Sequence, residues 1–152
     1  TLTYKGLINL ANDFNENMKF NFYCVGSEDF LPEKNSLDLC FTSPPYFDTE
    51  KYSNEPTQSY IRFNNEKDWV NGFLFQTLKN CYYGLKKDKY LIINICDIKK
   101  NNNFSLEKET IIIAQKIGFV FINEMKLALS NVNLKNKNSK FKYEPIFIFL
   151  KK

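Results

Sequence analysis

The chain has 152 residues, enough for one domain with its own core, and its 43% hydrophobic and 25% charged residues are typical of a globular protein. It contains no histidine, which excludes Ser-His-Asp and Cys-His catalysis and histidine-bound metals, and its net charge of +4 permits a polyanionic partner without requiring one. No apolar run reaches membrane-spanning length and there is no signal-peptide pattern, so we expect a cytoplasmic protein with no membrane contact and no metal site.

The first half of the chain opens on a helix and continues with two strands. Apolar residues at helical spacing predict an amphipathic helix over residues 4–14. An aromatic and apolar run predicts a strand over residues 20–25, which Gly26 ends. A second short apolar run predicts a strand over residues 37–41.

The second half alternates in the same way, with a helix, a strand, a helix and two final strands over residues 65–85, 90–96, 105–117, 119–125 and 146–150. Because strands and helices alternate, we expect an α/β fold with a mostly parallel sheet. No helix joins the last two strands, so we expect them to form an antiparallel pair.

The segment Thr42-Ser43-Pro44-Pro45-Tyr46 directly follows the strand over residues 37–41. Proline holds φ at about −65° and donates no backbone hydrogen bond, and the residue before a proline is pushed towards extended geometry. A stiff loop therefore presents the Ser43 hydroxyl, backbone carbonyls and the Tyr46 ring. In an open α/β sheet, ligands bind at the carboxyl ends of strands.

Ser43-Pro44-Pro45-Tyr46 resembles motif IV of the amino-methylating DNA methyltransferases, which use S-adenosylmethionine to methylate cytosine N4 or adenine N6. Residues 41–52 and 143–149 and the order of elements are similar to that family as well. The resemblance implies a Rossmann-like class I methyltransferase sheet, incomplete because the first two strands are absent, with residues 1–152 as a single, partial catalytic domain. A serine in the first position favours cytosine N4 over adenine N6.

One feature of the family is missing from the chain. The five glycines are too widely spaced to form the glycine-rich cofactor loop, which in the family follows its first strand. We expect that loop and the first two strands upstream of Thr1 in a longer protein, so this chain alone should bind S-adenosylmethionine poorly and be inactive. We also expect the 20–25 strand either to pair directly with the 37–41 strand or to leave an edge that favours an oligomer.

The resemblance implies a role for each residue of the motif. The Ser43 side chain and the Pro44 carbonyl accept the two hydrogens of the target amine, which turns its lone pair towards the methyl group. Pro45 belongs to the same catalytic loop, and Tyr46 stacks on the base after the base has left the duplex.

Two further groups of candidates follow from the fold that the resemblance implies. Asp29 and Phe30 are expected at the cofactor adenine, together with Thr42, although Asp29 equally fits a turn with solvated acids. Asp97 either belongs to the site or only ends a strand. The candidates for DNA contact lie in two loops with basic and aromatic residues, and they are Lys51, Tyr52, Tyr60, Arg62, Lys137 and Lys140.

The function that these features predict is a DNA methyltransferase domain of the restriction-modification type, with S-adenosylmethionine as cofactor and DNA as partner. Two alternatives stay open. RNA and protein-glutamine methylases also use a Pro-Pro-Tyr loop, usually after Asn or Asp. A half-domain without its cofactor loop could instead act as a nucleic-acid-binding or assembly module.

Overall fold

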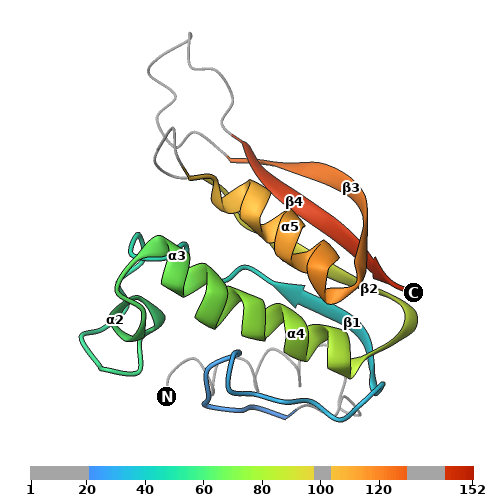
Figure 1. The fold of residues 1–152 in the computed structure, drawn as a ribbon, viewed down its shortest axis with the longest axis horizontal. Coiled ribbons are helices and arrows are strands. Elements are labelled where there is room, and N and C mark those ends of the chain that lie inside the picture. The colour runs from blue at the N-terminus through green and yellow to red at the C-terminus, as the bar shows by residue number, and fades with distance from the viewer. Residues whose placement is uncertain (1–20, 98–103, 130–142) are drawn as a thin grey trace, which may run out of the picture.

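The computed structural model describes residues 21–97, 104–129 and 143–152 (Figure 1). The four described strands form one mixed sheet in the order β1-β2-β4-β3, with bounds Leu37–Thr42, Leu85–Asn94, Tyr143–Lys151 and Phe119–Ala128, respectively. β1 and β2 are parallel, whereas β4 is antiparallel to both β2 and β3. The predicted α/β class and the antiparallel final pair are therefore confirmed. Where a mostly parallel sheet was expected, the described strands form a mixed sheet with one parallel and two antiparallel pairs.

A nearly continuous helical run connects β1 to β2. It consists of α3 (Glu66–Trp69), the π-helical turn η1 (Val70–Leu74) and α4 (Phe75–Gly84). The Asn65 side chain caps its start by accepting a hydrogen bond from the Asp68 N–H at 2.9 Å. A shorter helix, α2 (Ser59–Arg62), precedes this run.

The helix α5 (Leu106–Ile117) connects β2 to β3 and lies beside α4 on the same face of the sheet (Figure 1). Ser105 caps its first turn, and Gly118 ends it with a φ of 122°, a backbone conformation that favours glycine. Both helices begin and end within a residue of the predicted bounds. None of the described helices has the length and apolar character needed to cross a membrane.

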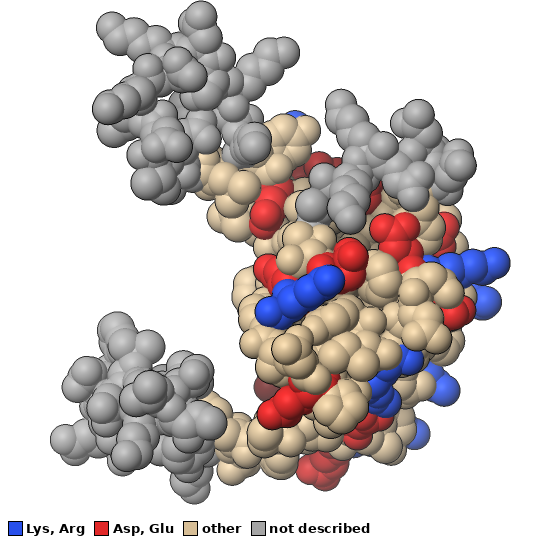
Figure 2. Space-filling model, turned by 90° about the vertical axis from the view of Figure 1, so that its left-hand side faces the viewer, with Lys and Arg blue, Asp and Glu red and all other residues tan. Residues whose placement is uncertain are grey.

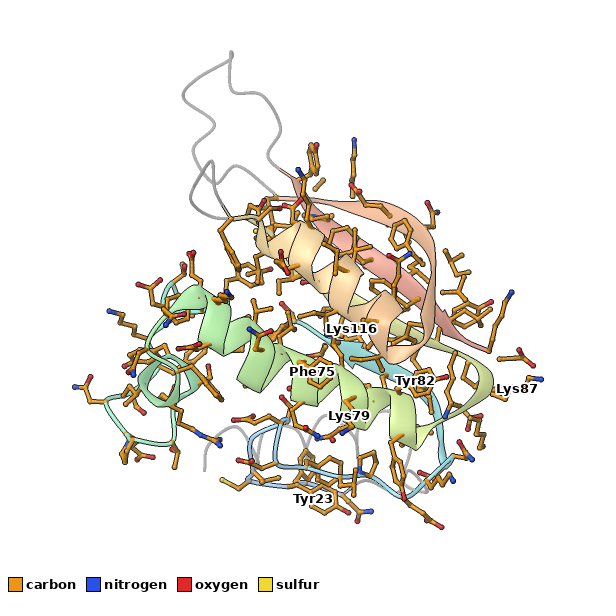
Figure 3. All side chains as sticks on the ribbon, in the orientation of Figure 1. Tyr23, Phe75, Lys79, Tyr82, Lys87 and Lys116 are labelled. Atoms are coloured by element: carbon orange, nitrogen blue, oxygen red, sulfur yellow. The ribbon has the colours of Figure 1, made fainter. Side chains whose placement is uncertain are left out.

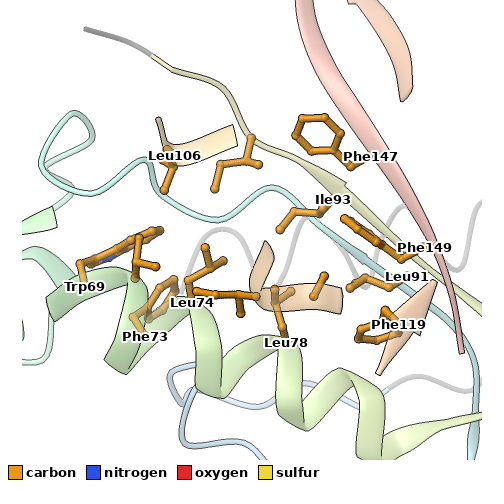
Figure 4. Close-up of a cluster of buried hydrophobic side chains, with 14 of the residues drawn as sticks. Trp69, Phe73, Leu74, Leu78, Leu91, Ile93, Leu106, Phe119, Phe147 and Phe149 are labelled. Carbon is orange, nitrogen blue, oxygen red and sulfur yellow. The ribbon is translucent and has the colours of Figure 1, made fainter. Parts of the chain in front are cut away.

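The core fills the space between these helices and the sheet (Figure 4). Strand register builds the sheet side of this core, because Leu91 is opposite Phe149 and Ile93 is opposite Phe147. All four side chains are almost fully buried. The helical run contributes Trp69, Phe73, Leu74 and Leu78.

The opposite face of the sheet has no described helix over it (Figure 1). Side chains alternate along a strand, so the residues between the core positions of β1 point to this face. Leu39 is 53% exposed and Phe41 is 66% exposed. Exposed apolar side chains also occur in β2, at Tyr90, and in β3, at Ile122, Met125 and Leu127.

The strand predicted for residues 20–25 is wrong for the described residues 21–25, which form no strand. A strand requires a hydrogen-bonded neighbour, and β1, the nearest candidate, pairs with β2 alone among the described strands. The predicted direct pairing of this segment with the 37–41 strand is therefore also wrong. The predicted helix over residues 4–14 and the loop over 131–142 lie outside the described residues.

Candidate functional site

The Ser43–Tyr46 loop lies where the carboxyl ends of two parallel strands meet. Thr42 is opposite Ile93 in the sheet, so Ser43 comes next to Asn94 as β1 ends. Two backbone bonds then turn the chain after Tyr46, from Phe47 N–H to the Pro45 carbonyl and from Thr49 N–H to the Tyr46 carbonyl, each at 3.1 Å. Phe47 takes a φ of 50°, a costly conformation for a bulky residue and one that often marks a functional site.

A hydrogen-bond network holds this loop against β2 and β4. The Ser43 hydroxyl donates to Asn94 Oδ1 at 3.3 Å. The Tyr46 hydroxyl is 3.3 Å from Asn94 Oδ1 and 3.2 Å from Glu144 Oε2, so two acceptors share its one proton. Asn94 Nδ2 donates to the Pro145 carbonyl at 3.0 Å. Both polar side chains of the motif are therefore tied to strands that lie far away in the sequence.

Tyr46 is only 9% exposed. Burial is the main cause that raises the pKa of Tyr46 well above its usual value, and nearby Cys96 and Glu144 add to it, although the Ser43 hydroxyl acts in the opposite direction. The phenol is therefore a neutral hydrogen-bond donor at physiological pH. Its ring forms part of the wall of a hollow at the same edge of the sheet.

This hollow is lined by aromatic and acidic residues and is partly open to solvent. Besides Tyr46, its lining includes the aromatic residues Phe47, Trp69 and Phe104. The acidic residues that line it are Asp48, Glu66 and Asp97. A flat group that carries an amine suits such walls, because rings stack on the group and carboxylates accept from the amine.

Cys96 also lines the hollow. Burial, with Glu144 and Glu107 nearby, raises the pKa of Cys96 to about 11. Since the thiolate and not the thiol is the nucleophile, the raised pKa makes Cys96 a weak nucleophile at neutral pH. The cysteine therefore belongs to the wall of the hollow and not to its chemistry.

Asp97 is occupied by the start of α5. Its carboxylate accepts from the Ser105 hydroxyl at 2.7 Å and from the Glu107 N–H at 3.1 Å. In return, the Asp97 N–H donates to the Glu107 side chain at 3.0 Å. Of the two alternatives for Asp97, this reciprocal arrangement favours a structural role at the helix N-terminus.

The three residues predicted for the cofactor are only partly brought together. Phe30 and Thr42 both line a second hollow, which lies between β1, α4 and the segment before β1. Asp29 does not line it, and its carboxylate is paired with Arg62 at 2.7 Å. The Phe30 ring contacts the Tyr23 ring, with 4.6 Å between their centroids. Tyr23 lies in the segment before β1 (Figure 3).

The described DNA-contact candidates fall between residues 51 and 62 of the sequence. Lys51 Nζ is 5.5 Å from the centroid of the Tyr60 ring, and the Tyr60 hydroxyl donates to the Ser53 carbonyl at 2.7 Å. Tyr52 is exposed and donates to Glu50 at 2.8 Å. Lys137 and Lys140 lie outside the described residues.

Arg62 is held by two carboxylates and is not free for a phosphate. Its guanidinium contacts Asp29 and Glu28, and the hydrogen bond to Asp29 is the main cause that raises the pKa of Arg62. Figure 2 shows basic and acidic side chains interspersed on the face in view, without one sign dominating. Electrostatics on that face alone would therefore attract a nucleic acid only weakly.

Asn94 and Glu144 were not among the candidates predicted from the sequence. The signal for Asn94 was available, since an amide between Ile93 and Ile95 interrupts an apolar strand just where that strand ends. A buried amide requires partners, and the adjacent loop provides them. Glu144 gave no local signal, because strand pairing alone brings it to Tyr46.

The chain is similar to known DNA methylases. A family model described as "DNA methylase" matches residues 37–152. A curated relative, the type II beta methyltransferase M.BslI of Bacillus sp. (strain NEB-606), is 28% identical over 104 residues, which are 61% of this chain and 10% of that protein.

Two solved structures share the fold at low sequence identity. The PvuII DNA methyltransferase (cytosine-N4-specific) has a TM-score of 0.58 and 18% identity, over 86% of this chain and 48% of that one. A Thermus thermophilus protein assigned as a DNA modification methylase, complexed with S-adenosyl-L-methionine, has a TM-score of 0.56 and 20% identity, over 84% of this chain and 54% of that one. The chain thus spans about half the length of these solved structures.

Proposed function

Since the DNA methylase model matches most of the chain, the chain belongs to that family, and we propose that it forms the amine-binding half of an S-adenosylmethionine-dependent DNA methyltransferase. One observation carries this proposal: Ser43 and Tyr46 are hydrogen-bonded at the carboxyl ends of β1 and β2, beside a hollow with aromatic walls. Ligands of open α/β sheets bind at that edge.

The exocyclic amine of a base is a poor nucleophile, because its lone pair is delocalised into the ring. In our proposal the Ser43 hydroxyl oxygen and the Pro44 carbonyl accept the two amine hydrogens. These two bonds hold the nitrogen lone pair towards the methyl donor and prepare an in-line attack, an effect of orientation and proximity. Bound S-adenosylmethionine supplies an electrophilic methyl group on a sulfonium.

The hollow lined by Tyr46, Phe47 and Trp69 is the space that we propose for the flipped base. An aromatic contact with a base contributes about 1–3 kcal/mol. Ser43, as a serine in the first motif position, favours cytosine N4 as the acceptor over adenine N6.

The described residues fit the cofactor only in part. Phe30 and Thr42 line a hollow beside β1 whose apolar wall suits an adenine ring. Asp29 is committed to Arg62, and no glycine-rich loop occurs in the 152 residues. We therefore propose that polypeptide outside this chain completes the cofactor site, and that Lys51, Tyr52 and Tyr60 contribute to the contact with DNA.

The test is an acceptor assay with the full-length protein and tritiated S-adenosylmethionine. Duplex DNA should take up label, whereas structured RNA and a glutamine peptide should not. Ser43→Ala should lower kcat by about 10²-fold, since it removes an acceptor that orients the amine. Ser36→Ala is the matched control, because Ser36 is a surface serine that bonds only to the nearby Glu33 carbonyl in the described structure.

Two outcomes would contradict the proposal. Labelling of RNA or peptide in place of DNA would favour the alternative amine methylases. Full-length protein that binds DNA but labels no acceptor would favour the non-catalytic module.

A further inference from the structure

Asn94 is the residue that links the two side-chain hydroxyls of the motif. It is the last residue of β2, it lies between Ile93 and Ile95, and it is only 7% exposed. A buried amide destabilises a fold unless both its ends are hydrogen-bonded. Here Nδ2 bonds to the Pro145 carbonyl, and Oδ1 faces the hydroxyls of Ser43 and Tyr46.

The orientation of this amide is determined by β4. Asn94 is opposite Ile146 in the β2–β4 pair, which brings the carbonyl of Pro145 to the end of β2. A carbonyl only accepts hydrogen bonds, so only the NH₂ group of Asn94 can face it at 3.0 Å. The amide oxygen must therefore point towards Ser43 and Tyr46.

This orientation has a consequence for Ser43. A hydroxyl can donate or accept, and a Ser43 proton aimed at the target amine would occupy the lone pair that has to attack. Asn94 Oδ1 cannot donate, so the Ser43 proton points to Asn94 and the lone pairs of Oγ stay available on the other side. We propose that Asn94 is a positioning residue that makes Ser43 a hydrogen-bond acceptor for the target amine, an inference that rests on the proposed function.

The first test measures kcat and KM of full-length Asn94 variants. Asn94→Leu removes the acceptor at similar volume, and we expect kcat to fall by about 10²-fold while KM for DNA changes by less than about threefold. Asn94→Asp retains an acceptor oxygen and should recover about tenfold of that loss. The matched control is Thr110→Val, which removes a buried hydroxyl bond to the Leu106 carbonyl in α5 and should leave kcat unchanged.

Stability separates this role from a merely structural one. Asn94→Asp buries a charge near Glu144 and should be the least stable variant, whereas Asn94→Leu should be the least active one. Denaturant unfolding gives the stability order, and initial rates give the order of kcat. If kcat follows stability across the three variants, the proposal is wrong.

A double-mutant cycle with Ser43→Ala tests whether Asn94 acts through Ser43. Once the hydroxyl is gone, Asn94→Leu should cause little further loss of kcat, so the double variant should match Ser43→Ala alone. Losses that multiply would show that Asn94 acts independently and would overturn the proposal.

A readout without activity tests the contact itself. In protein with ¹³C-labelled tyrosine, the Cζ resonance of Tyr46, assigned with Tyr46→Phe, should shift in Asn94→Leu, and an unchanged resonance would contradict the network. If the wild-type protein methylates no DNA base, both the proposed function and this role of Asn94 are wrong. If the wild-type protein methylates DNA and Asn94→Leu leaves kcat unchanged, only the role of Asn94 is wrong.

Discussion

For Tyr46, the structure shows contacts that the sequence alone does not indicate. Its place after two prolines predicts a flat ring for stacking, which stays a prediction, whereas the bonds of its hydroxyl to Asn94 and Glu144 depend on strand pairing. A motif is a local pattern and can be recognised in the sequence. The partners of its side chains are non-local, because β2 and β4 supply them.

Cys96 gives a prediction at this scale. Because burial is the main cause that raises its pKa to about 11, the thiol stays protonated at pH 8 and should react with iodoacetamide far more slowly than the exposed Cys24. Peptide-level mass spectrometry after timed alkylation measures both rates. The Cys96 rate should climb as the pH rises towards 11, and a Cys96 rate equal to that of Cys24 at pH 8 would contradict its neutral state.

The raised pKa of Cys96 also makes the free energy of unfolding depend on pH in a defined direction. A thiol whose folded pKa lies above its unfolded value stabilises the fold fully below the unfolded pKa of about 9, and it loses this contribution as the pH rises to about 11. Cys96→Ala should therefore reduce the decline in unfolding free energy over that range. Urea titrations at pH 8 and pH 10.5 provide the comparison.

At the scale of elements, helices were easier to predict than strands. The helices that end at Gly84 and Ile117 have local signals, namely apolar periodicity, capping residues and Gly118. β2 begins at Leu85, five residues before the predicted start at Tyr90, because Leu37 pairs with Leu85 across a register shift. Residues 21–25 have a strand-like pattern but form no strand, so the pattern alone was insufficient.

Lys151 provides the prediction for this scale. At the end of β4, its ammonium donates to the carbonyls of Tyr82 and Leu85, each at 2.6 Å, and to Asn35 at 2.9 Å. It also lies 4.8 Å from the Tyr82 ring centroid. Figure 3 shows Tyr82 near the end of α4. These bonds satisfy carbonyls that the end of α4 leaves open.

Lys151→Met should lower the free energy of unfolding by about 1–3 kcal/mol, since it removes charge-assisted hydrogen bonds and retains the apolar stem. Lys152→Met is the control, because Lys152 is exposed and should be neutral within about 0.5 kcal/mol. Urea unfolding followed by circular dichroism compares the two. Equal midpoints for both variants would show that Lys151 does not stabilise the α4 terminus.

At the scale of the whole molecule, one face of the sheet is covered and the other carries exposed apolar residues such as Leu39 and Phe41. Parallel strand pairs are normally covered on both faces, and an uncovered apolar face or edge favours association. Neither the pattern of β1 nor its length indicates which face of the sheet has no helix over it among the described residues. That conclusion requires the positions of α4 and α5.

The prediction at this scale is that the 152-residue chain, expressed alone, self-associates. Sedimentation velocity should detect species larger than a monomer at micromolar concentration. Phe41→Lys should shift the distribution towards the monomer, whereas Leu31→Lys, at an exposed apolar residue outside the sheet, should not. A chain that stays monomeric, or an equal response to both substitutions, would contradict association through this face.

The central claim concerns one nitrogen atom, and mass spectrometry of nucleosides tests it most directly. DNA incubated with the full-length protein and S-adenosylmethionine is digested and analysed for methylated nucleosides. We predict N4-methylcytosine with wild-type protein and with Ser36→Ala, and its loss with Ser43→Ala. Detection of N6-methyladenine in place of N4-methylcytosine would show that adenine, and not cytosine, is the target base. The absence of any methylated base amine would contradict the account.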